Sequence, residues 1–560
     1  MPNQSPPQTA LQAVGAYRSS IPIPRSGCAS HGPRRFRSST AISIVFTGHP
    51  VGLCDAHHSG SPTADAIILL LLTRLLGNAT DGQGKGVMIG WMALPTAVRQ
   101  AFVCERSSQP LYFLVIVKRW SMQKLMRMAV VVCLLLGLNR AYAVPSFARQ
   151  TGLSCNVCHS NPPELTAFGR NFKLKGYVLT DMTATDKIGN SKDLLLSKYI
   201  PLSAMVLLSN TTFQADQPAS QNNAAGFPQQ LSIFLAGAFA AHFGGMAQVT
   251  YTHTDDHFGM DNTDLRYGNE RKLGGKDWEY GIDLNNNPTV EDLWNSTPAW
   301  GFPWISSPSG VGSLASPIIN GGLGQDVAGV GAYSMWNNHL YTDFTAYRSE
   351  HAGASTPVTG SGQGYNISGV APYWRAAWQQ TWGSNYLEVG TYGIYVKSFP
   401  NAISGPEDTY LDPSIDFQYE RPFGPNLLDI HGTYIRENSN LDATYAAGGA
   451  STQSNHLNTL KLDSTYHWAS KYSATGALFS TTGNADALLY APAPLTGSNN
   501  GNPDTSGYIA QFGYWPVQNI DLDINYSGYF KFNGATTNYD GANRNASDNN
   551  TLYLALWVMF

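Results

Sequence analysis

Alternating apolar and polar positions run through the second half of the chain. Residues 519–534, with the sequence NIDLDINYSGYFKFNG, keep this alternation with little interruption. Because successive side chains of a strand point to opposite faces, the run predicts a β-strand with one apolar and one polar face. The same period recurs at residues 235–241, 428–434 and 460–466. The apolar face of the first run carries Ile520, Leu522, Ile524, Tyr526, Phe530 and Phe532, and its polar face carries Asp521, Asp523, Asn525, Ser527, Tyr529 and Lys531.

The last nine residues distinguish between two architectures that share this alternation. A soluble sandwich would bury the apolar face, whereas a membrane barrel would turn it outward to lipid. Residues 552–560, LYLALWVMF, place Leu552, Leu554, Leu556, Val558 and the terminal Phe560 on one face. This ending is similar to the C-terminal strand of bacterial outer-membrane barrels, which typically ends on an aromatic residue. The sequence therefore favours an outer-membrane barrel over the sandwich.

Length and composition agree with a barrel. The 560-residue chain is only 13% charged and 12% aromatic, and its second half contains no run of 18 apolar residues that would predict a membrane helix. Residues 199–560 are predicted to form the barrel. At about 22 residues per strand and connection, this region predicts on the order of 16 antiparallel strands. The predicted fold class is therefore all-β. No catalytic triad, P-loop or nucleotide fingerprint stands out there, and no nucleic-acid partner is expected.

An export signal is predicted inside the chain and not at its first residue. Residues 122–143 combine a basic start, an apolar run over 129–138 and a small-x-small cleavage site that ends at Ala143. Because such a signal has to be N-terminal, residues 1–121 are interpreted as an upstream extension that does not fold, with translation beginning at Met122, Met126 or Met128. The alternative is a genuine extra domain.

Residues 155–159, Cys-Asn-Val-Cys-His, have the spacing of a c-type haem attachment site. The two thiols add to the haem vinyl groups, and the following histidine becomes the proximal iron ligand. Cleavage after Ala143 would leave Cys155 and Cys158 as the only cysteines. A zinc site would need two more clustered ligands, and a thioredoxin-like site would need a βαβ context, neither of which is visible. We therefore expect one covalent haem c, held by Cys155 and Cys158 and ligated by His159.

The haem-bearing piece, residues 144–198, is too short to bury a haem alone. A short amphipathic helix is predicted to start at Leu165 and Thr166 and to end at Gly176. Residues 144–198 hold 7 Lys plus Arg against 4 Asp plus Glu, whereas residues 199–560 hold 13 against 30. A basic helical segment inside an acidic lumen would be attracted electrostatically. We therefore expect a small helical cytochrome plug inside the barrel, although the acidic residues would equally suit solvent-exposed loops.

Residues 144–159, VPSFARQTGLSCNVCH, and residues 163–177, PELTAFGRNFKLKGY, together resemble the fused monohaem cytochrome–porin family. Residues 285–294 also look like a segment of related chains. That family includes outer-membrane iron oxidases. The resemblance implies a bacterial outer-membrane protein that oxidises extracellular Fe(II) and passes electrons through its haem to a periplasmic c-type cytochrome. No iron-binding residue is implied, because no matching motif is present.

Three other functions remain open at this point. The chain would be a diffusion porin if the haem-bearing segment were only a structural or regulatory plug. It would be a conduit for another donor or acceptor if the haem did not meet Fe(II). A soluble haem-bearing β protein is the third possibility, and it would be found in the periplasm. The same fold can serve each of these functions. The chain is an Fe(II) oxidase only if Fe(II) is the electron donor to its haem.

The sixth haem ligand is not evident from the sequence. Met182 is the closest methionine downstream, followed by Met205, and His242, His253 and His257 come later. Met182 is the candidate for the metal-ligating role, although packing or surface roles compete for each of these residues. Methionine ligation would raise the haem potential relative to histidine.

Replacing Met182 by Leu tests this candidate. If Met182 is the sixth ligand, the substitution removes the thioether and changes the visible spectrum of the reduced haem. An unchanged spectrum would remove Met182 from consideration.

Overall fold

The computed structural model describes residues 145–179, 185–187, 195–197, 199–218, 221–350, 365–400 and 402–560. The expectations for residues 1–121, for the signal peptide at 122–143 and for Met182 therefore lie outside the described residues. No helix in the described ranges is long and apolar enough to cross a membrane.

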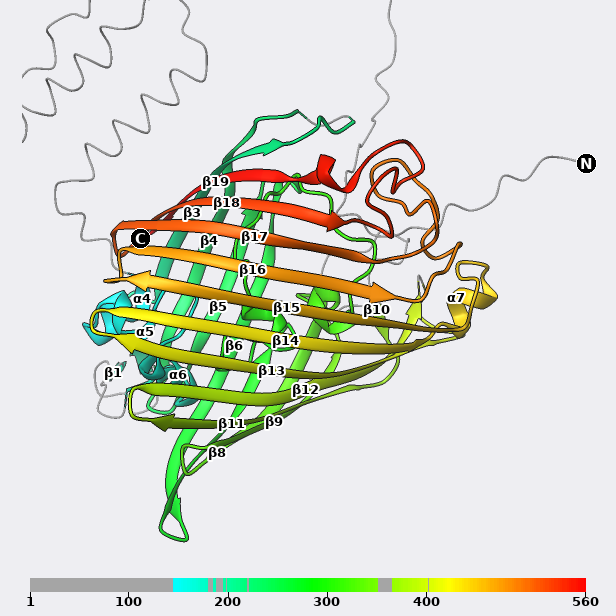
Figure 1. Cartoon of the computed structure of the whole chain (residues 1–560). Coiled ribbons are helices and arrows are strands. Elements are labelled where there is room, and N and C mark those ends of the chain that lie inside the picture. Colours follow the sequence, from blue (N-terminus) through cyan, green and yellow to red (C-terminus); the bar gives the residue numbers. More distant parts are fainter. Residues whose placement is uncertain are drawn as a thin grey trace, which may run out of the picture. The chain divides into compact units, whose positions relative to one another are not determined.

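Sixteen antiparallel strands, each paired with its sequence neighbour, form the wall of a closed barrel (Figure 1). The ring closes where the last strand pairs with the first long one, from Thr551–Phe213 to Met559–Met205. The predicted strand number is confirmed. The strands are β3 (Leu202–Phe213), β4 (Ala224–Ala240), β5 (Phe243–Thr252), β6 (His257–Leu273), β7 (Lys276–Asn285), β8 (Val327–Trp336), β9 (Leu340–Ser349), β11 (Ala371–Trp382), β12 (Asn385–Pro400), β13 (Asp408–Phe423), β14 (Asn426–Asn440), β15 (Ser454–Trp468), β16 (Tyr472–Gly483), β17 (Thr505–Val517), β18 (Ile520–Lys531) and β19 (Thr551–Met559).

The wall turns its apolar face outward and its polar face inward. Ile415 is 60% exposed, while its neighbour Asp416 is 3% exposed. The same arrangement recurs around the wall, with exposed apolar residues next to buried acids in Ile282–Asp283, Phe344–Asp343, Val389–Glu388 and Ile524–Asp523. A water-soluble β protein has the opposite arrangement, so the sandwich alternative is wrong for this part of the chain. An outward apolar band is the pattern of transmembrane barrels.

The two ends of the barrel differ in their connections. At one end, which we call the short-turn end, seven hairpins turn in two or three residues each, such as 274–275 and 424–425. The opposite end, the long-loop end, carries the longer connections, including residues 286–326 and 484–504. Exposed aromatic side chains gather at the strand ends beside the short turns, namely Trp336, Trp382, Phe423, Trp468 and Tyr472. Such a girdle is typical of a membrane–water interface.

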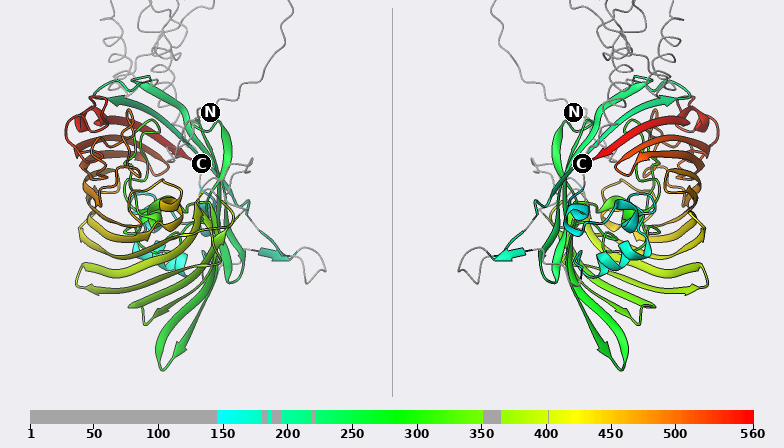
Figure 2. Two further views of the ribbon diagram at one scale, coloured as in Figure 1. Left: turned by 90° about the vertical axis from the view of Figure 1, so that its right-hand side faces the viewer. Right: turned by 90° about the vertical axis from the view of Figure 1, so that its left-hand side faces the viewer.

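Among the described residues ahead of the wall there are three short helices, α4 (Ser146–Thr151), α5 (Cys155–Cys158) and α6 (Ala167–Leu174). They lie within the ring of strands near the short-turn end, in cyan in Figure 2. A contact with the β17–β18 turn supports this placement, since the Cys155 amide donates to Gln518 Oε1 over 2.9 Å. Helix α6 begins at Thr166, whose hydroxyl accepts from the Gly169 amide, and its end is followed by Gly176 at φ 72°. These bounds confirm the predicted helix.

The connection between β7 and β8, residues 286–326, packs against the same helices. It contains two short helical turns, η1 (Pro298–Trp300) and η2 (Ile318–Gly322). Leu293 and Trp294 from this connection share a buried cluster with Leu174 of α6 and with wall residues Tyr333 and Tyr341. The core of the molecule therefore lies inside the barrel, between the wall, this connection and the helices.

Two features differ from the expectations. Phe532 was predicted on the outward face, but β18 ends at Lys531 and Phe532 is fully buried with Tyr539 and Ala546 in the following connection. The apolar–polar alternation of the sequence continues past the end of β18, but outside a strand this alternation does not decide which way a side chain points. Residues 144–198 also contain a hairpin of β1 (Thr185–Lys187) and β2 (Leu195–Ser197), so the region is not purely helical. A further three-residue strand, β10 (Tyr365–Ile367), pairs with β12 just ahead of β11.

The outward face gives a direct test of membrane insertion. Ile415 lies midway along β13, so Ile415→Lys should lower the free energy of unfolding by about 2–4 kcal/mol in lipid vesicles. Urea titration followed by tryptophan fluorescence measures this change. Ile403→Lys is the matched control, because Ile403 is 71% exposed between β12 and β13 and should cost little. If both variants lower the free energy of unfolding by the same small amount, the assignment of Ile415 to the lipid-facing surface is contradicted.

Candidate haem site

The two cysteines lie one helical turn apart. Helix α5 consists of Cys155-Asn-Val-Cys158 alone, and the His159 amide donates to the Cys155 carbonyl oxygen over 2.9 Å. Both thiols are half-buried and free. Burial raises the pKa of the Cys158 thiol to about 11, so it is not the low-pKa thiolate of a redox-active pair. Two free thiols on one turn fit covalent haem attachment.

The ring of His159 is oriented by the backbone of the loop that follows it. Its Nδ1 lies 3.2 Å from the Glu164 carbonyl oxygen, so Nδ1–H donates there and Nε2 is left as the lone-pair nitrogen. Desolvation lowers the pKa of His159 and favours the neutral imidazole that binds a metal. A hydrogen bond on the far nitrogen is the usual way in which proteins orient a metal-ligating histidine. His159 therefore fits the role of proximal iron ligand.

The start of α6 is hydrogen-bonded to the turn of residues 155–159. The Thr166 amide donates to the Cys158 carbonyl oxygen over 2.9 Å, and the Thr166 hydroxyl donates to the Val157 carbonyl oxygen over 2.6 Å. Gly169 comes so close that an added Cβ would lie 2.2 Å from the Cys158 carbonyl oxygen. Only glycine fits there. The sequence indicated α6 as a cover for the haem, but not that it also holds the attachment turn in place.

Basic residues of this segment pair with acids of the barrel wall. Arg170 donates to Glu420 and Lys175 lies 2.8 Å from Glu270. The Lys173 ammonium donates to the Val290 and Asp292 carbonyl oxygens over 2.6 Å each, and it lies 3.7 Å from Asp264. These contacts agree with the opposite net charges of the two parts of the sequence.

Glycines in the wall let the segment approach closely. An added Cβ at Gly268 would lie 2.7 Å from the Lys175 carbonyl carbon, and one at Gly244 would lie 2.6 Å from the Gly176 carbonyl oxygen. At Gly237 the Cβ would meet the Gln150 amide at 2.4 Å. Sequence reasoning missed these positions, because glycine in a strand gives no sign of what lies against it.

Of the other candidate ligands in the described residues, two lie at the opposite end of the barrel from Cys155. His253 and His257 flank the connection between β5 and β6 at the long-loop end, whereas α5 lies at the short-turn end. Met205 is a buried residue of β3 that pairs with Met559 of β19. His242 is in the β4–β5 turn, where its ring contacts that of Tyr267. The structure thus brings Cys155, Cys158 and His159 together on one turn and places His253 and His257 away from it.

No family model matches the chain, and no curated protein matches it. Several solved outer-membrane channels are similar in fold. The channel DcaP of Acinetobacter baumannii is 15% identical, with a TM-score of 0.39, over 64% of this chain and 96% of that one. The anion-selective porin from Comamonas acidovorans is 11% identical, with a TM-score of 0.38, over 64% and 98%. Similarity this distant carries no argument about activity.

Gly169→Ala should disturb the haem turn specifically. The new methyl group would collide with the Cys158 carbonyl oxygen, so α6 and the turn have to separate. We expect less covalent haem per chain, measured by haem staining and by pyridine haemochrome absorbance. Gly476→Ala is the control, since a Cβ at that wall position meets nothing within 4 Å. Equal haem content in both variants would contradict the clamping role of α6.

Proposed function

We propose that this chain is a bacterial outer-membrane electron-transfer protein with one covalent haem c, which oxidises extracellular Fe(II) and passes electrons to a periplasmic c-type cytochrome. The observation that carries the proposal is the geometry of residues 155–159. Two free thiols share one helical turn, and the next residue offers an imidazole whose Nδ1 is already bonded. When bound, the haem supplies a one-electron Fe(III)/Fe(II) couple.

The orientation of the barrel supports a periplasmic acceptor. In bacterial outer-membrane barrels the short turns face the periplasm and the long loops face outward. The attachment turn lies at the short-turn end, where the Cys155 amide bonds to Gln518 in the β17–β18 turn. Ser154 and Asn156, which flank Cys155, are exposed. A periplasmic cytochrome docking at this end would therefore meet the haem-bearing turn.

Packing inside the barrel restricts free solute flow through it. The helices and residues 286–326 meet in the lumen, with Leu174 against Leu293 and Trp294. The Leu165 amide also donates to Asn295 Oδ1 over 3.0 Å. Contacts of this kind hold both segments in the path that a diffusing solute would take.

A haem-plugged diffusion porin is the second candidate. The barrel fold by itself supports this function better than it supports electron transfer. One observation favours it: a cavity of about 270 Å³ lies beside α6, lined in part by Arg170, Asn171, Gln379 and Thr381. Its remaining lining includes the apolar residues Leu174, Leu293 and Met335. A cavity next to the segment is where a solute path would open. A conduit for another donor or acceptor is a third use of the same haem.

Fe(II) reduction of the haem tests the first candidate. Purified protein in detergent at neutral pH should show the reduced-haem bands after anaerobic Fe(II) is added. Fe(II) gives up one electron and the haem iron accepts it. His159→Ala should lose the low-spin spectrum, because the proximal ligand is gone.

A haem that stays oxidised with Fe(II) but is reduced by dithionite would overturn the Fe(II) assignment. Solute flux through liposomes containing the protein would then favour the porin. If solute flux is below that of an open porin and another electron donor reduces the haem, the conduit is favoured.

A further inference from the structure

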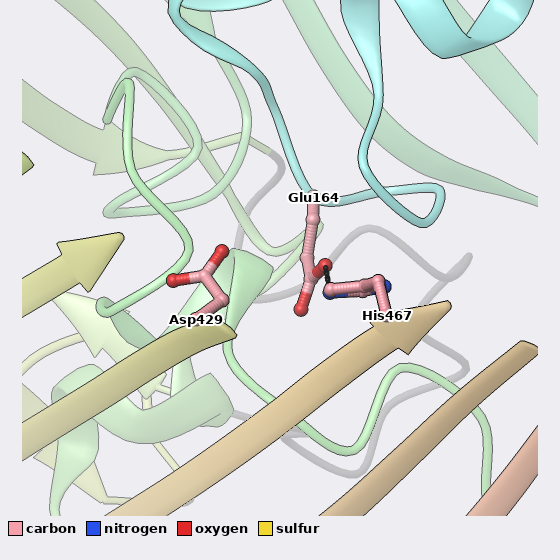
Figure 3. Close-up of side chains that lie close together, drawn as sticks. All are labelled: Glu164, Asp429 and His467. Carbon is pink, nitrogen blue, oxygen red and sulfur yellow. Dashed lines mark ion pairs between the residues drawn. The ribbon is translucent and has the colours of Figure 1, made fainter. Parts of the chain in front are cut away.

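Three buried side chains from different parts of the chain converge in one cluster (Figure 3). Glu164 comes from the loop between α5 and α6, Asp429 from the start of β14, and His467 from the end of β15. One donor atom from each lies within 4.8 Å of the other two. Glu164 Oε2 and His467 Nε2 are 3.2 Å apart. The cluster exists only when the helical segment is seated in the barrel.

The three side chains are almost completely buried, yet one carboxylate oxygen among them has no partner. The exposed fractions are 0% for Glu164, 1% for Asp429 and 5% for His467. Glu164 Oε1 has no hydrogen-bond partner, and Asp429 Oδ1 and His467 Nε2 have an ion-pair contact each but no hydrogen bond. Buried polar atoms nearly always have a hydrogen-bond partner, and a bound ion is a standard reason for an exception. The cluster therefore has the character of a ligand site.

The surrounding groups orient the same side chains. Ser160 donates from its hydroxyl to Glu164 Oε2 over 2.9 Å. His431 places Nε2 3.3 Å from Asp429 Oδ1 and Nδ1 2.9 Å from Asp463 Oδ2. Outer partners of this kind fix the direction of metal ligands.

The donor set indicates the class of ion. Two carboxylates and one imidazole suit divalent first-row transition metals, since imidazole selects against calcium and magnesium. Such ions bind these donors at about 2.0–2.2 Å, which places the donor atoms roughly 3–4 Å apart. The observed separations need only a small closure.

We propose that Glu164, Asp429 and His467 bind one divalent first-row transition-metal ion in addition to the haem iron. The ion joins the haem-bearing loop to two strands of the wall. Its binding does not depend on electron transfer, so this site can exist whether or not Fe(II) reduces the haem.

Metal content tests the proposal. Haem-bearing protein is isolated from cells grown with added Mn(II), so that the site can load during folding. Elemental analysis counts non-haem transition metals, and pyridine haemochrome absorbance counts haem. We expect about one extra metal ion per haem in the wild type. Asp429→Asn and His467→Gln should each retain less than one-fifth of it, because each removes a donor but keeps a similar shape.

Asp521→Asn is the matched control. Asp521 is another buried wall carboxylate, near the start of β18, and lies outside the cluster. This variant should keep the metal. Electron paramagnetic resonance distinguishes bound from free Mn(II) in all samples. Heat-dependent gel mobility shows whether the barrel of each variant is folded. If a wall variant is not folded, Glu164→Gln is used in its place.

Two outcomes overturn the site. One is a folded wild type without a stoichiometric extra metal, and the other is equal retention in wild type, cluster variants and Asp521→Asn. Equal metal retention in all of these proteins would mean that the metal binds to the acidic residues of the lumen in general and not to the cluster. If the extra metal is retained but Fe(II) does not reduce the haem, the metal site is supported and the proposed function is overturned.

Discussion

Backbone hydrogen bonding inside a membrane is the constraint on which the rest of this structure depends. Hydrocarbon offers no partner for an exposed N–H or C=O group, so every strand needs a neighbour on both sides. The pairing of β19 with β3 meets that need by joining the two ends of the sheet. Closure also creates an interior, and the alternation of the strands makes that interior polar and acidic.

An acidic interior has to be neutralised, and different parts of the chain do this. Arg375 of β11 lies 3.0 Å from Asp292 of the 286–326 connection and 3.0 Å from Glu388 of β12, and it also donates to Asp416 Oδ2 over 2.8 Å. The helical segment adds Lys173 and Arg170. Burying unpaired carboxylates would be costly, so these cations tie the inner segments to the wall. The turn of residues 155–159 is positioned by the same ion pairs, because Arg170 and Lys173 lie on α6, which packs against the Cys158 carbonyl oxygen.

How much was predictable depends on whether a feature is local. The thiol pair with its histidine, the cap of α6 at Thr166 and the outward face of β18 are encoded within a few residues, and sequence reasoning found them. Phe532 was misplaced because the alternation continued beyond the end of its strand. Glu164, Asp429 and His467 were not found. Glu164 lies more than 250 positions ahead of the other two, which come from different strands, and a single buried acid or histidine gives no periodic signal.

The amino-acid sequence by itself determined the strand period, the number of strands, the terminal strand that closes the ring and the local chemistry of residues 155–159. These features depend on side-chain type at short spacing. Only the tertiary structure decided which end of the barrel holds the haem turn, which wall glycines admit the helices and which carboxylates meet Arg170, Lys173 and His467. Those pairings arise from closing the ring around the N-terminal segment, and this closure brings together residues that no local pattern relates.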